Sequence, residues 1–474
     1  MNDALSLWRG LGPALIAACA SVAGCTPGAD SGAQVDCTEP GDIDCSPDVG
    51  GAGNKSDQWN SVNDPSRFAT NLVYRFDDLP TSGATERTAW ASTYWPYMED
   101  STNVRWQGDD TLSPLEKYDL VFNGWKPSEA FKGLRPMTSC GDEYDKDYYE
   151  QLGPAAKWMS TKRGNGAMRD GKDSDGDEKI DECDEDYDGI EPWWGLCHAW
   201  VPAAVLEPEP QAAAEKDGVR FDVSDLTALL ITAYDGTESM FLGSRCNAKE
   251  VERDPVTNRI MQDECRDTNA GSFHVVAANM LGLRKRAFAE DRTFDYEVWN
   301  QPVVRFAVTE QRKLTASEAN VLLKAAPRDA YAFNAKAVEF IEIQAELDYI
   351  TESLASTSPT TPTIDRYTRT DEYHYILELD ADRKIIGGEW LSDRHPDFLW
   401  LPLRAGGTRS NPYVDLREVQ KLVRSTLGPV EGPVGGDGGV TEDPPTPACE
   451  DAYRDGSGRC RRGDGAFAPA ACCQ

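Results

Sequence analysis

The segment EPWWGLCHAWVPAA, residues 191–204, places one cysteine between a tryptophan-glycine turn and an apolar run. The continuation CHAWVPAAVL predicts a helix that begins at Cys197, and Pro202 predicts that this helix is short or kinked. The positive end of a helix and a neighbouring imidazolium both favour a thiolate over a thiol. Cys197 is therefore a candidate nucleophile. The alternative is that it is buried or half of a disulfide, which is the commoner fate of a cysteine before an apolar helix.

A cysteine nucleophile needs a base, and the chain has four histidines. His198 follows Cys197 directly, and on a helix the two side chains point about 100° apart. His374 lies in an alternating segment typical of a hairpin strand, and His395 precedes a proline. These three positions make the remaining histidine, His274, the best candidate.

His274 lies in GSFHVVAANMLG, which we interpret as an apolar strand, and Asp291 follows 17 positions later. A cysteine on a helix, a histidine on a strand and an acid on the next strand follow the chain order of papain-like and transglutaminase-like folds. The sequence thus predicts a triad of Cys197, His274 and Asp291. Asp295 is a nearby alternative for the acid, and a core role is the alternative for His274.

The acidic stretch DGKDSDGDEKIDECDEDYDGIE, residues 170–191, ends just before this site. Its aspartates surround a glycine turn and offer hard oxygen ligands, so we predict calcium binding. The bidentate glutamate of an EF-hand is missing, and the spacing resembles thrombospondin type 3 calcium repeats instead. The alternative is a solvated acidic loop. The predicted ligands are Asp173, Asp175, Asp177, Asp181, Asp184, Asp186 and Asp188.

Composition excludes several classes of protein. The 474 residues carry 48 Lys+Arg against 81 Asp+Glu, a net charge of −33, which disfavours nucleic acid and anionic membranes as partners. No apolar run reaches the roughly 18–20 residues of a membrane-spanning helix. The apolar share of 40% is enough for a sizeable core. The chain is therefore predicted to be globular.

The N-terminal segment LGPALIAACASVAGC indicates export, because a short apolar region ends in small residues before Cys25. Residues 22–25 resemble a bacterial lipobox, so residues 1–24 are predicted to be a lipoprotein signal peptide. The alternatives are ordinary cleavage near residues 18–20 and no export. The predicted location is the bacterial (outer) membrane or cell surface, with the membrane reached only through a lipid on Cys25.

The domain plan follows from composition. Residues 25–65 predict a disordered tether, 66–427 one catalytic domain, 428–448 a Gly/Pro-rich linker and 449–474 a Cys-rich tail. With Cys19 removed and Cys25 lipidated, 11 of the 13 cysteines remain, so one is left over if the others form disulfides. The pairs suggested by proximity in the chain are Cys37 with Cys45, Cys246 with Cys265, and Cys140 with Cys183.

The middle of the chain mixes helix and strand signals. Residues 414–428 predict an amphipathic helix capped by Asp415 and Glu418, and residues 373–391 predict a hairpin. The stretches TASEANVLLKAA and VSDLTALLITAYDG also predict helices. The predicted fold class is α+β, with a cysteine-protease/transglutaminase-like core, a nucleophile cysteine at a helix N-terminus, and disulfide stabilisation.

Several blocks make a family resemblance specific. EVWNQPVVRFAVTE, residues 297–310, resembles the elicitor peptide of the calcium-dependent cell-wall transglutaminases of oomycete plant pathogens. Further blocks agree in order across residues 70–427: YWPYMEDSTNVRW, SPLEKYD, WWGLCHAWVPAAVLEPEP, FHVVAANMLG and EYHYILELDADRKIIGGEWLSDRHPDFLWLP. The likeness does not extend to the lipobox, the acidic loop or the Cys-rich tail.

The resemblance implies a protein-glutamine γ-glutamyltransferase that acts on proteins bearing glutamine and lysine, with Cys197 as nucleophile, His274 as base and Asp291 as orienting acid. It also implies calcium dependence. The aspartates of the acidic stretch cannot be matched residue by residue to the corresponding part of the family. A papain-like cysteine peptidase or amidase and a calcium-stabilised surface-binding protein without activity remain alternatives. The oligomeric state stays open.

Overall fold

The computed structural model describes residues 61–134, 146–161 and 191–428, apart from short gaps at 254, 256–259, 263–264, 266–267, 294–295 and 407–409. It also describes the two short strands β11 (Tyr453–Arg454) and β12 (Cys460–Arg461), which pair antiparallel. The chain divides into two compact units, Met1–Leu427 and Gly428–Gln474. No helix in the described ranges is long and apolar enough to cross a membrane.

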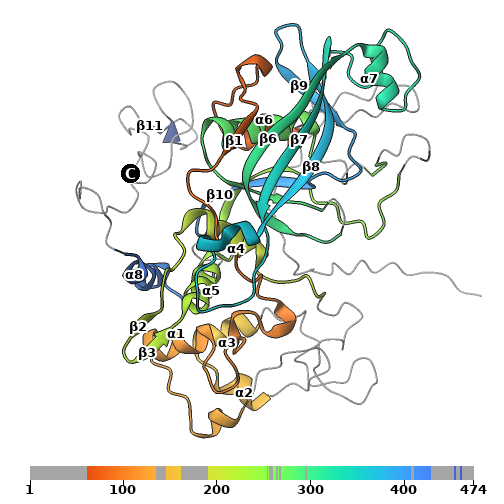
Figure 1. Ribbon diagram of the computed structural model, residues 1–474. Coiled ribbons are helices and arrows are strands. Elements are labelled where there is room, and N and C mark those ends of the chain that lie inside the picture. Colours follow the sequence, from red (N-terminus) through yellow and green to blue (C-terminus); the bar gives the residue numbers. More distant parts are fainter. Residues whose placement is uncertain are drawn as a thin grey trace, which may run out of the picture. The chain divides into compact units, whose positions relative to one another are not determined.

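The first unit is built on an antiparallel sheet in which the strands run in the order β4-β10-β5-β6-β7-β8-β9, with β1 paired to β6 (Figure 1). The predicted hairpin is confirmed as β8 and β9. The strands are β1 (Ser82–Ala84), β4 (Glu238–Gly243), β5 (Phe288–Asp291), β6 (Asn300–Leu314), β7 (Glu339–Ile350), β8 (Thr368–Leu379), β9 (Ile385–Trp390) and β10 (Phe398–Arg404), with a separate pair β2 (Ala214–Lys216) and β3 (Val219–Phe221).

The predicted helices are confirmed, and two of them begin at predicted capping residues. Thr315 and Glu318 form the predicted capping box before α7, and the side chain of Asp415 caps α8 by accepting from Arg417 N. Glu418 does not complete a capping box with Asp415; its carboxylate accepts a hydrogen bond from Lys421 Nζ. The helices are α1 (Pro114–Phe122), α2 (Lys146–Gln151), α3 (Pro154–Ser160), α4 (Cys197–Leu206), α5 (Val223–Tyr234), α6 (Ala270–Ala277), α7 (Ala316–Leu322) and α8 (Leu416–Thr426).

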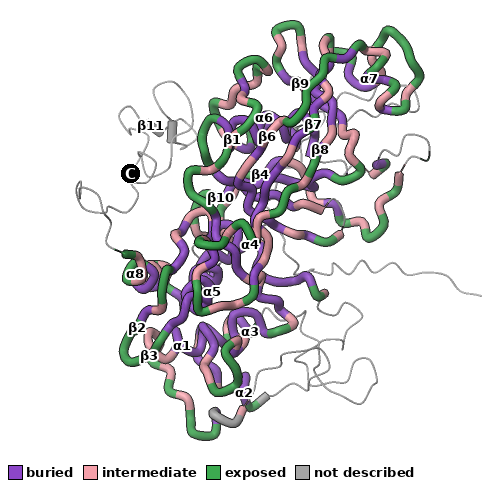
Figure 2. The backbone as a smooth tube through the Cα atoms, viewed as in Figure 1, coloured by how far each residue is buried: buried purple, intermediate pink, exposed green. Residues whose placement is uncertain are grey.

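Two apolar cores lie on opposite faces of the sheet. Figure 2 shows that the helices α4, α5 and α6 and the strands of the sheet are largely buried. Trp400 on β10 belongs to the core that contains α4 and α5, whereas its neighbour Leu399 belongs to the core that contains α6. On β5, Ala289 and Phe288 divide in the same way. Because successive side chains of a strand point to opposite faces, the two cores flank the sheet. They are called the α4 core and the α6 core below.

The segment around His274 is a helix, not the predicted strand. Asn269 caps α6, because its side chain accepts from Gly271 N and Ser272 N. The helix continues into a π-helical turn at Ala278–Leu283. A short, uniformly apolar run is consistent with either a buried strand or a buried helix, so periodicity alone could not decide. The cap at Asn269 was the signal for a helix.

The predicted disulfide between Cys246 and Cys265 is confirmed, with an S–S distance of 2.00 Å. It closes the segment between β4 and α6 and lies in a small apolar cluster with Ile260. Cys246 N donates to Asp397 Oδ2 at 2.7 Å, which ties this segment to the chain just before β10. The pairs proposed for Cys37 with Cys45 and Cys140 with Cys183 lie outside the described residues.

Candidate active site

The turn before α4 is clamped by the segment 94–97. Leu196 N donates to Tyr94 O at 2.6 Å, and Tyr97 N donates to Trp194 O at 2.9 Å. A Cβ on Gly195 would lie 2.6 Å from Tyr94 O, so only glycine allows this close approach. Helix α4 then begins at Cys197, and no side chain caps it. The turn thus places the Cys197 thiol at the positive end of a helix, as predicted.

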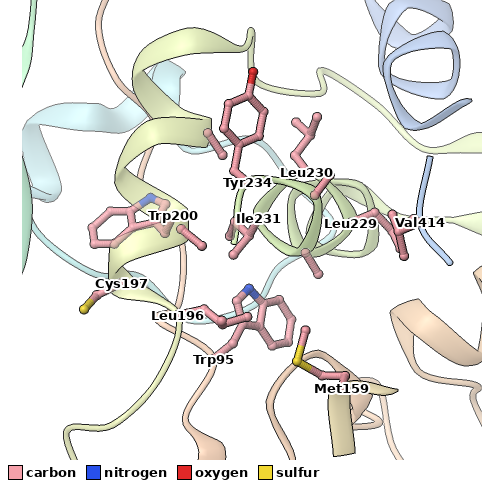
Figure 3. Close-up of a cluster of buried hydrophobic side chains, with 14 of the residues drawn as sticks. Trp95, Met159, Leu196, Cys197, Trp200, Leu229, Leu230, Ile231, Tyr234 and Val414 are labelled. Atoms are coloured by element: carbon pink, nitrogen blue, oxygen red, sulfur yellow. The ribbon is translucent and has the colours of Figure 1, made fainter. Parts of the chain in front are cut away.

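Cys197 is buried with 1% of its surface exposed and is not part of a disulfide. Figure 3 shows it at the start of α4, with its sulfur directed away from the side chains of α5. Asn300 Nδ2 lies 3.5 Å from the sulfur, and Val298 O lies 3.8 Å from it. Both residues belong to the chain that enters β6. The sulfur therefore faces the sheet rather than the α5 side of its core.

The structure brings Asp291 to this site. Asp291 pairs with Asn300 in the register of β5 and β6 and is fully buried. Its Oδ1 accepts from Trp299 N at 2.9 Å, while Oδ2 has no hydrogen-bond partner among the described residues. Burial raises the pKa of Asp291 well above its usual range, and the charge of Cys197 raises it further, against the backbone hydrogen bonds. The carboxyl therefore gives up its proton less readily while Cys197 is a thiolate.

The structure does not bring His274 to Cys197. His274 lies in the α6 core, on the opposite face of the sheet. Its Nδ1 lies 2.8 Å from Tyr375 Oη, and Phe76 and Phe306 pack on its ring. Burial lowers its pKa to about 3. The predicted pairing of His274 with Cys197 and Asp291 is therefore wrong in geometry, because chain order does not determine the face of the sheet on which a residue lies.

His198 occupies the position expected of a base. Its Nε2 lies 2.9 Å from Asp235 Oδ1, just after the end of α5, and the side chain is 25% exposed. Burial lowers its pKa, but the hydrogen bond to Asp235 and the interaction with the Cys197 sulfur outweigh it and raise the pKa to about 9. Within the described structure, Nδ1 is buried without a hydrogen bond of ordinary geometry. His198 is thus held by the Asp235 carboxylate and lies within electrostatic reach of the Cys197 sulfur.

Sequence reasoning set His198 aside because adjacent helical residues diverge. At the first turn of α4 the imidazole nevertheless lies within electrostatic reach of the sulfur, because the interaction with Cys197 contributes to the raised pKa of His198. The carboxylate partner is 37 positions away in sequence, in the turn after an apolar helix. Asn300, whose Nδ2 contacts the sulfur, is a further residue that the sequence did not single out as part of the site.

Aromatic side chains lie on the segments that flank Cys197 in the structure. Tyr94 and Trp299 make an edge-on contact with ring centroids 5.6 Å apart, and Trp193 makes a similar contact with Tyr296 at 5.6 Å. Burial raises the pKa of Tyr94, and the charges of Glu99, Glu352 and Cys197 add to this effect. The phenol therefore lies within electrostatic reach of the sulfur.

The other predicted site residues lie outside the described residues. This applies to Asp173, Asp175, Asp177, Asp181, Asp184, Asp186 and Asp188, to the alternative acid Asp295, and to the lipobox cysteine Cys25. In the part of the chain that is described, no group of three His, Cys, Asp or Glu side chains could hold a metal ion. Calcium binding by the acidic stretch therefore stays a prediction.

The fold and the buried cysteine define a transglutaminase-like protein. Residues 64–426 match the transglutaminase elicitor family, and the chain belongs to that family. The structure is similar to the crystal structure of the GP42 transglutaminase from Phytophthora sojae, with a TM-score of 0.57 and 29% sequence identity over 78% of this chain and 99% of that chain. A comparison with curated proteins finds no match. The predicted family and the predicted α+β, transglutaminase-like fold are confirmed.

Proposed function

We propose that this protein is a protein-glutamine γ-glutamyltransferase. The observation that carries the proposal is the Cys197 thiol at the uncapped start of α4, next to the His198 imidazole that Asp235 holds. Membership of the transglutaminase elicitor family supports the reaction class. A thiolate beside an imidazolium is the usual arrangement of a cysteine that attacks acyl groups.

In the first half-reaction, the Cys197 thiolate attacks the carboxamide carbon of a substrate glutamine. An S–C bond forms, and the carbonyl electron pair moves to oxygen to give an oxyanion. When the oxyanion collapses, the C–N bond breaks and the imidazolium of His198 gives its proton to the departing nitrogen, which leaves as ammonia. The products are a thioester at Cys197 and a neutral imidazole, whose orientation the hydrogen bond to Asp235 fixes.

In the second half-reaction, an amine such as a lysine side chain attacks the thioester. The N–C bond forms, His198 takes the amine proton, and the S–C bond breaks to restore the thiolate. Asp291 serves this step. Burial still raises the pKa of Asp291 in the thioester, but the sulfur carries no charge there, so the thiolate contribution is absent and the carboxyl releases its proton to solvent more readily than beside the thiolate. The buried Oδ2 then accepts a proton from the arriving ammonium group.

We further propose that the protein is exported and anchored through a lipid on Cys25, and that calcium bound by residues 170–191 sets the position of the nucleophile turn. The sequence alone supports both statements. The acidic stretch ends at Glu191, next to Trp193 and Trp194 in the turn that leads to Cys197. Protein substrates at a bacterial surface fit this location. An arm with chelator in the experiment below tests the role of calcium.

The proposed mechanism predicts an alkaline limit near pH 9. The pKa of His198 is raised above its usual value of 6.5 to about 9, so the imidazolium is present at neutral pH and is lost as the pH rises through about 9. Amine incorporation should fall over the same range. In Asp235→Asn the carboxylate charge is gone, so the limit should move down by about one pH unit or more. A profile of kcat against pH checks this, and an unchanged limit in Asp235→Asn would contradict the assignment of His198.

Incorporation of a fluorescent primary amine into a glutamine-rich protein tests the function. The purified protein should label its substrate and release ammonia, and Cys197→Ala should do neither. Both proteins are assayed with calcium and with chelator, and loss of labelling in chelator would assign calcium a role. Release of peptides by the wild-type protein but not by Cys197→Ala, without labelling, would make the protein a peptidase. Absence of both activities would remove the proposal in favour of a binding protein.

A further inference from the structure

Asn300 bridges the nucleophile and a buried tryptophan. It is the first residue of β6, is 3% exposed, and lies with Trp400 of β10 on the same face of the sheet as Cys197. Its Nδ2 is 3.5 Å from Cys197 Sγ, and its Oδ1 accepts from Trp400 Nε1 at 2.8 Å. β5 runs between β6 and β10 in the sheet, so the two side chains meet across an intervening strand.

The tryptophan determines which end of the amide faces the sulfur. An indole N–H can only donate, so the amide oxygen must face Trp400, and the NH2 group must then face Cys197. The ring of Trp400 is held in turn, because it is 3% exposed and stacks on Phe241 with centroids 5.9 Å apart. The orientation of the Asn300 amide is therefore fixed before a substrate arrives.

We infer that Asn300 is a further catalytic residue, which donates from its amide to the Cys197 thiolate and then to the oxyanion of the glutamine carbonyl, and that Trp400 is its positioning residue. This rests on the proposed function. An N–H group directed at sulfur stabilises the anion more than the neutral thiol. The oxyanion forms on the carbon that is bonded to the Cys197 sulfur. The second N–H of the Asn300 amide therefore lies close to the oxyanion. No proton leaves Asn300 in either step.

Two variants separate this role from packing. Asn300→Asp keeps the size of the side chain and an acceptor for Trp400, but places a carboxylate oxygen at the sulfur. Trp400→Phe keeps a ring on Phe241 and removes only the indole part with its N–H. Trp200→Phe is the matched control, because Trp200 is also fully buried in the α4 core and its N–H goes to the Trp90 carbonyl at 3.1 Å.

The first readout is the rate at which iodoacetamide alkylates Cys197 as a function of pH, which requires no turnover. In Asn300→Asp and Trp400→Phe the midpoint of this profile should move to higher pH, and in Trp200→Phe it should stay where it is in the wild type. The second readout is steady-state amine incorporation. We expect kcat to fall about 10²-fold or more in Asn300→Asp and about tenfold in Trp400→Phe, with KM unchanged, because a donor directed at the oxyanion is removed or left free to turn.

The inference is overturned if Asn300→Asp and Trp400→Phe both keep the alkylation profile of the wild type and a kcat equal to that of the control Trp200→Phe. It is also overturned if KM rises while kcat stays constant, since that would assign the two residues to substrate binding. A wild-type protein that incorporates no amine contradicts the proposed function, and the alkylation profiles then still decide whether Asn300 and Trp400 stabilise the thiolate.

Discussion

Replacing His198 with alanine is expected to lower kcat/KM for amine incorporation by about 10²–10⁴-fold, the usual contribution of a positioned acid-base group. In the proposed mechanism His198 holds the proton that the leaving ammonia needs, and its pKa of about 9 keeps that proton available at neutral pH. Its partner Asp235 fixes the ring at 2.9 Å. The effect should appear in the rate of ammonia release as well as in amine incorporation, since ammonia leaves as the thioester forms and the amine then attacks that thioester.

His274→Ala is the matched comparison. This ring is buried in the α6 core, on the far side of the sheet from Cys197, and bonds Tyr375. Its loss should lower the free energy of unfolding by about 2–5 kcal/mol, as removal of a large buried side chain does. Activity per folded molecule should stay close to that of the wild type, with urea denaturation giving the stability. If His274→Ala removed activity from folded protein and His198→Ala did not, the result would support the predicted triad with His274 as base and contradict the assignment of His198.

Asp291→Asn is expected to reduce transamidation by about 10²-fold and to change the balance of products. The amide keeps an acceptor for Trp299 N and Thr293, so the local fold should persist. It can no longer take a proton from an arriving ammonium group. The rate of thioester formation should therefore fall less than the rate of amine transfer. A larger share of the thioester should then react with water. Ammonia release and amine incorporation, measured on the same samples, give the ratio of the two.

Glu290→Gln is the control for this change. Glu290 precedes Asp291 on β5, is fully buried and has a raised pKa, chiefly through burial. Neither of its carboxyl oxygens has a hydrogen-bond partner in the described structure. Strand alternation places it on the α6 face, away from Cys197. Its product ratio should equal that of the wild type, and an equal change in both variants would show that charge in the sheet, not a group at the thiol, sets the balance.

The sequence predicted the parts of the site that depend on local pattern. The tryptophan-glycine turn and the apolar run placed Cys197 at a helix start, and the position of Asp291 near it was also predicted. His274 was misassigned because an apolar segment fits a helix as well as a strand, and because chain order does not say which face of a sheet a residue reaches.

The remaining site residues depend on packing between distant elements. Asp235 reaches His198 only because α5 packs against α4, and Trp400 reaches Asn300 only because β10 and β6 flank the same strand. No local pattern marks either pair. The adjacent letters C and H were visible in the sequence, but the interaction of the two side chains depends on the turn that Gly195 allows against Tyr94.

Intact-protein mass spectrometry of the protein, quenched in acid during incubation with a glutamine-containing peptide without added amine, tests the central claim directly. We expect an adduct with the mass of the peptide less one ammonia, located on Cys197 by fragmentation and discharged by an added primary amine. Absence of the adduct on Cys197 in folded protein, or the same adduct in Cys197→Ala, would contradict the assignment of this cysteine as the nucleophile.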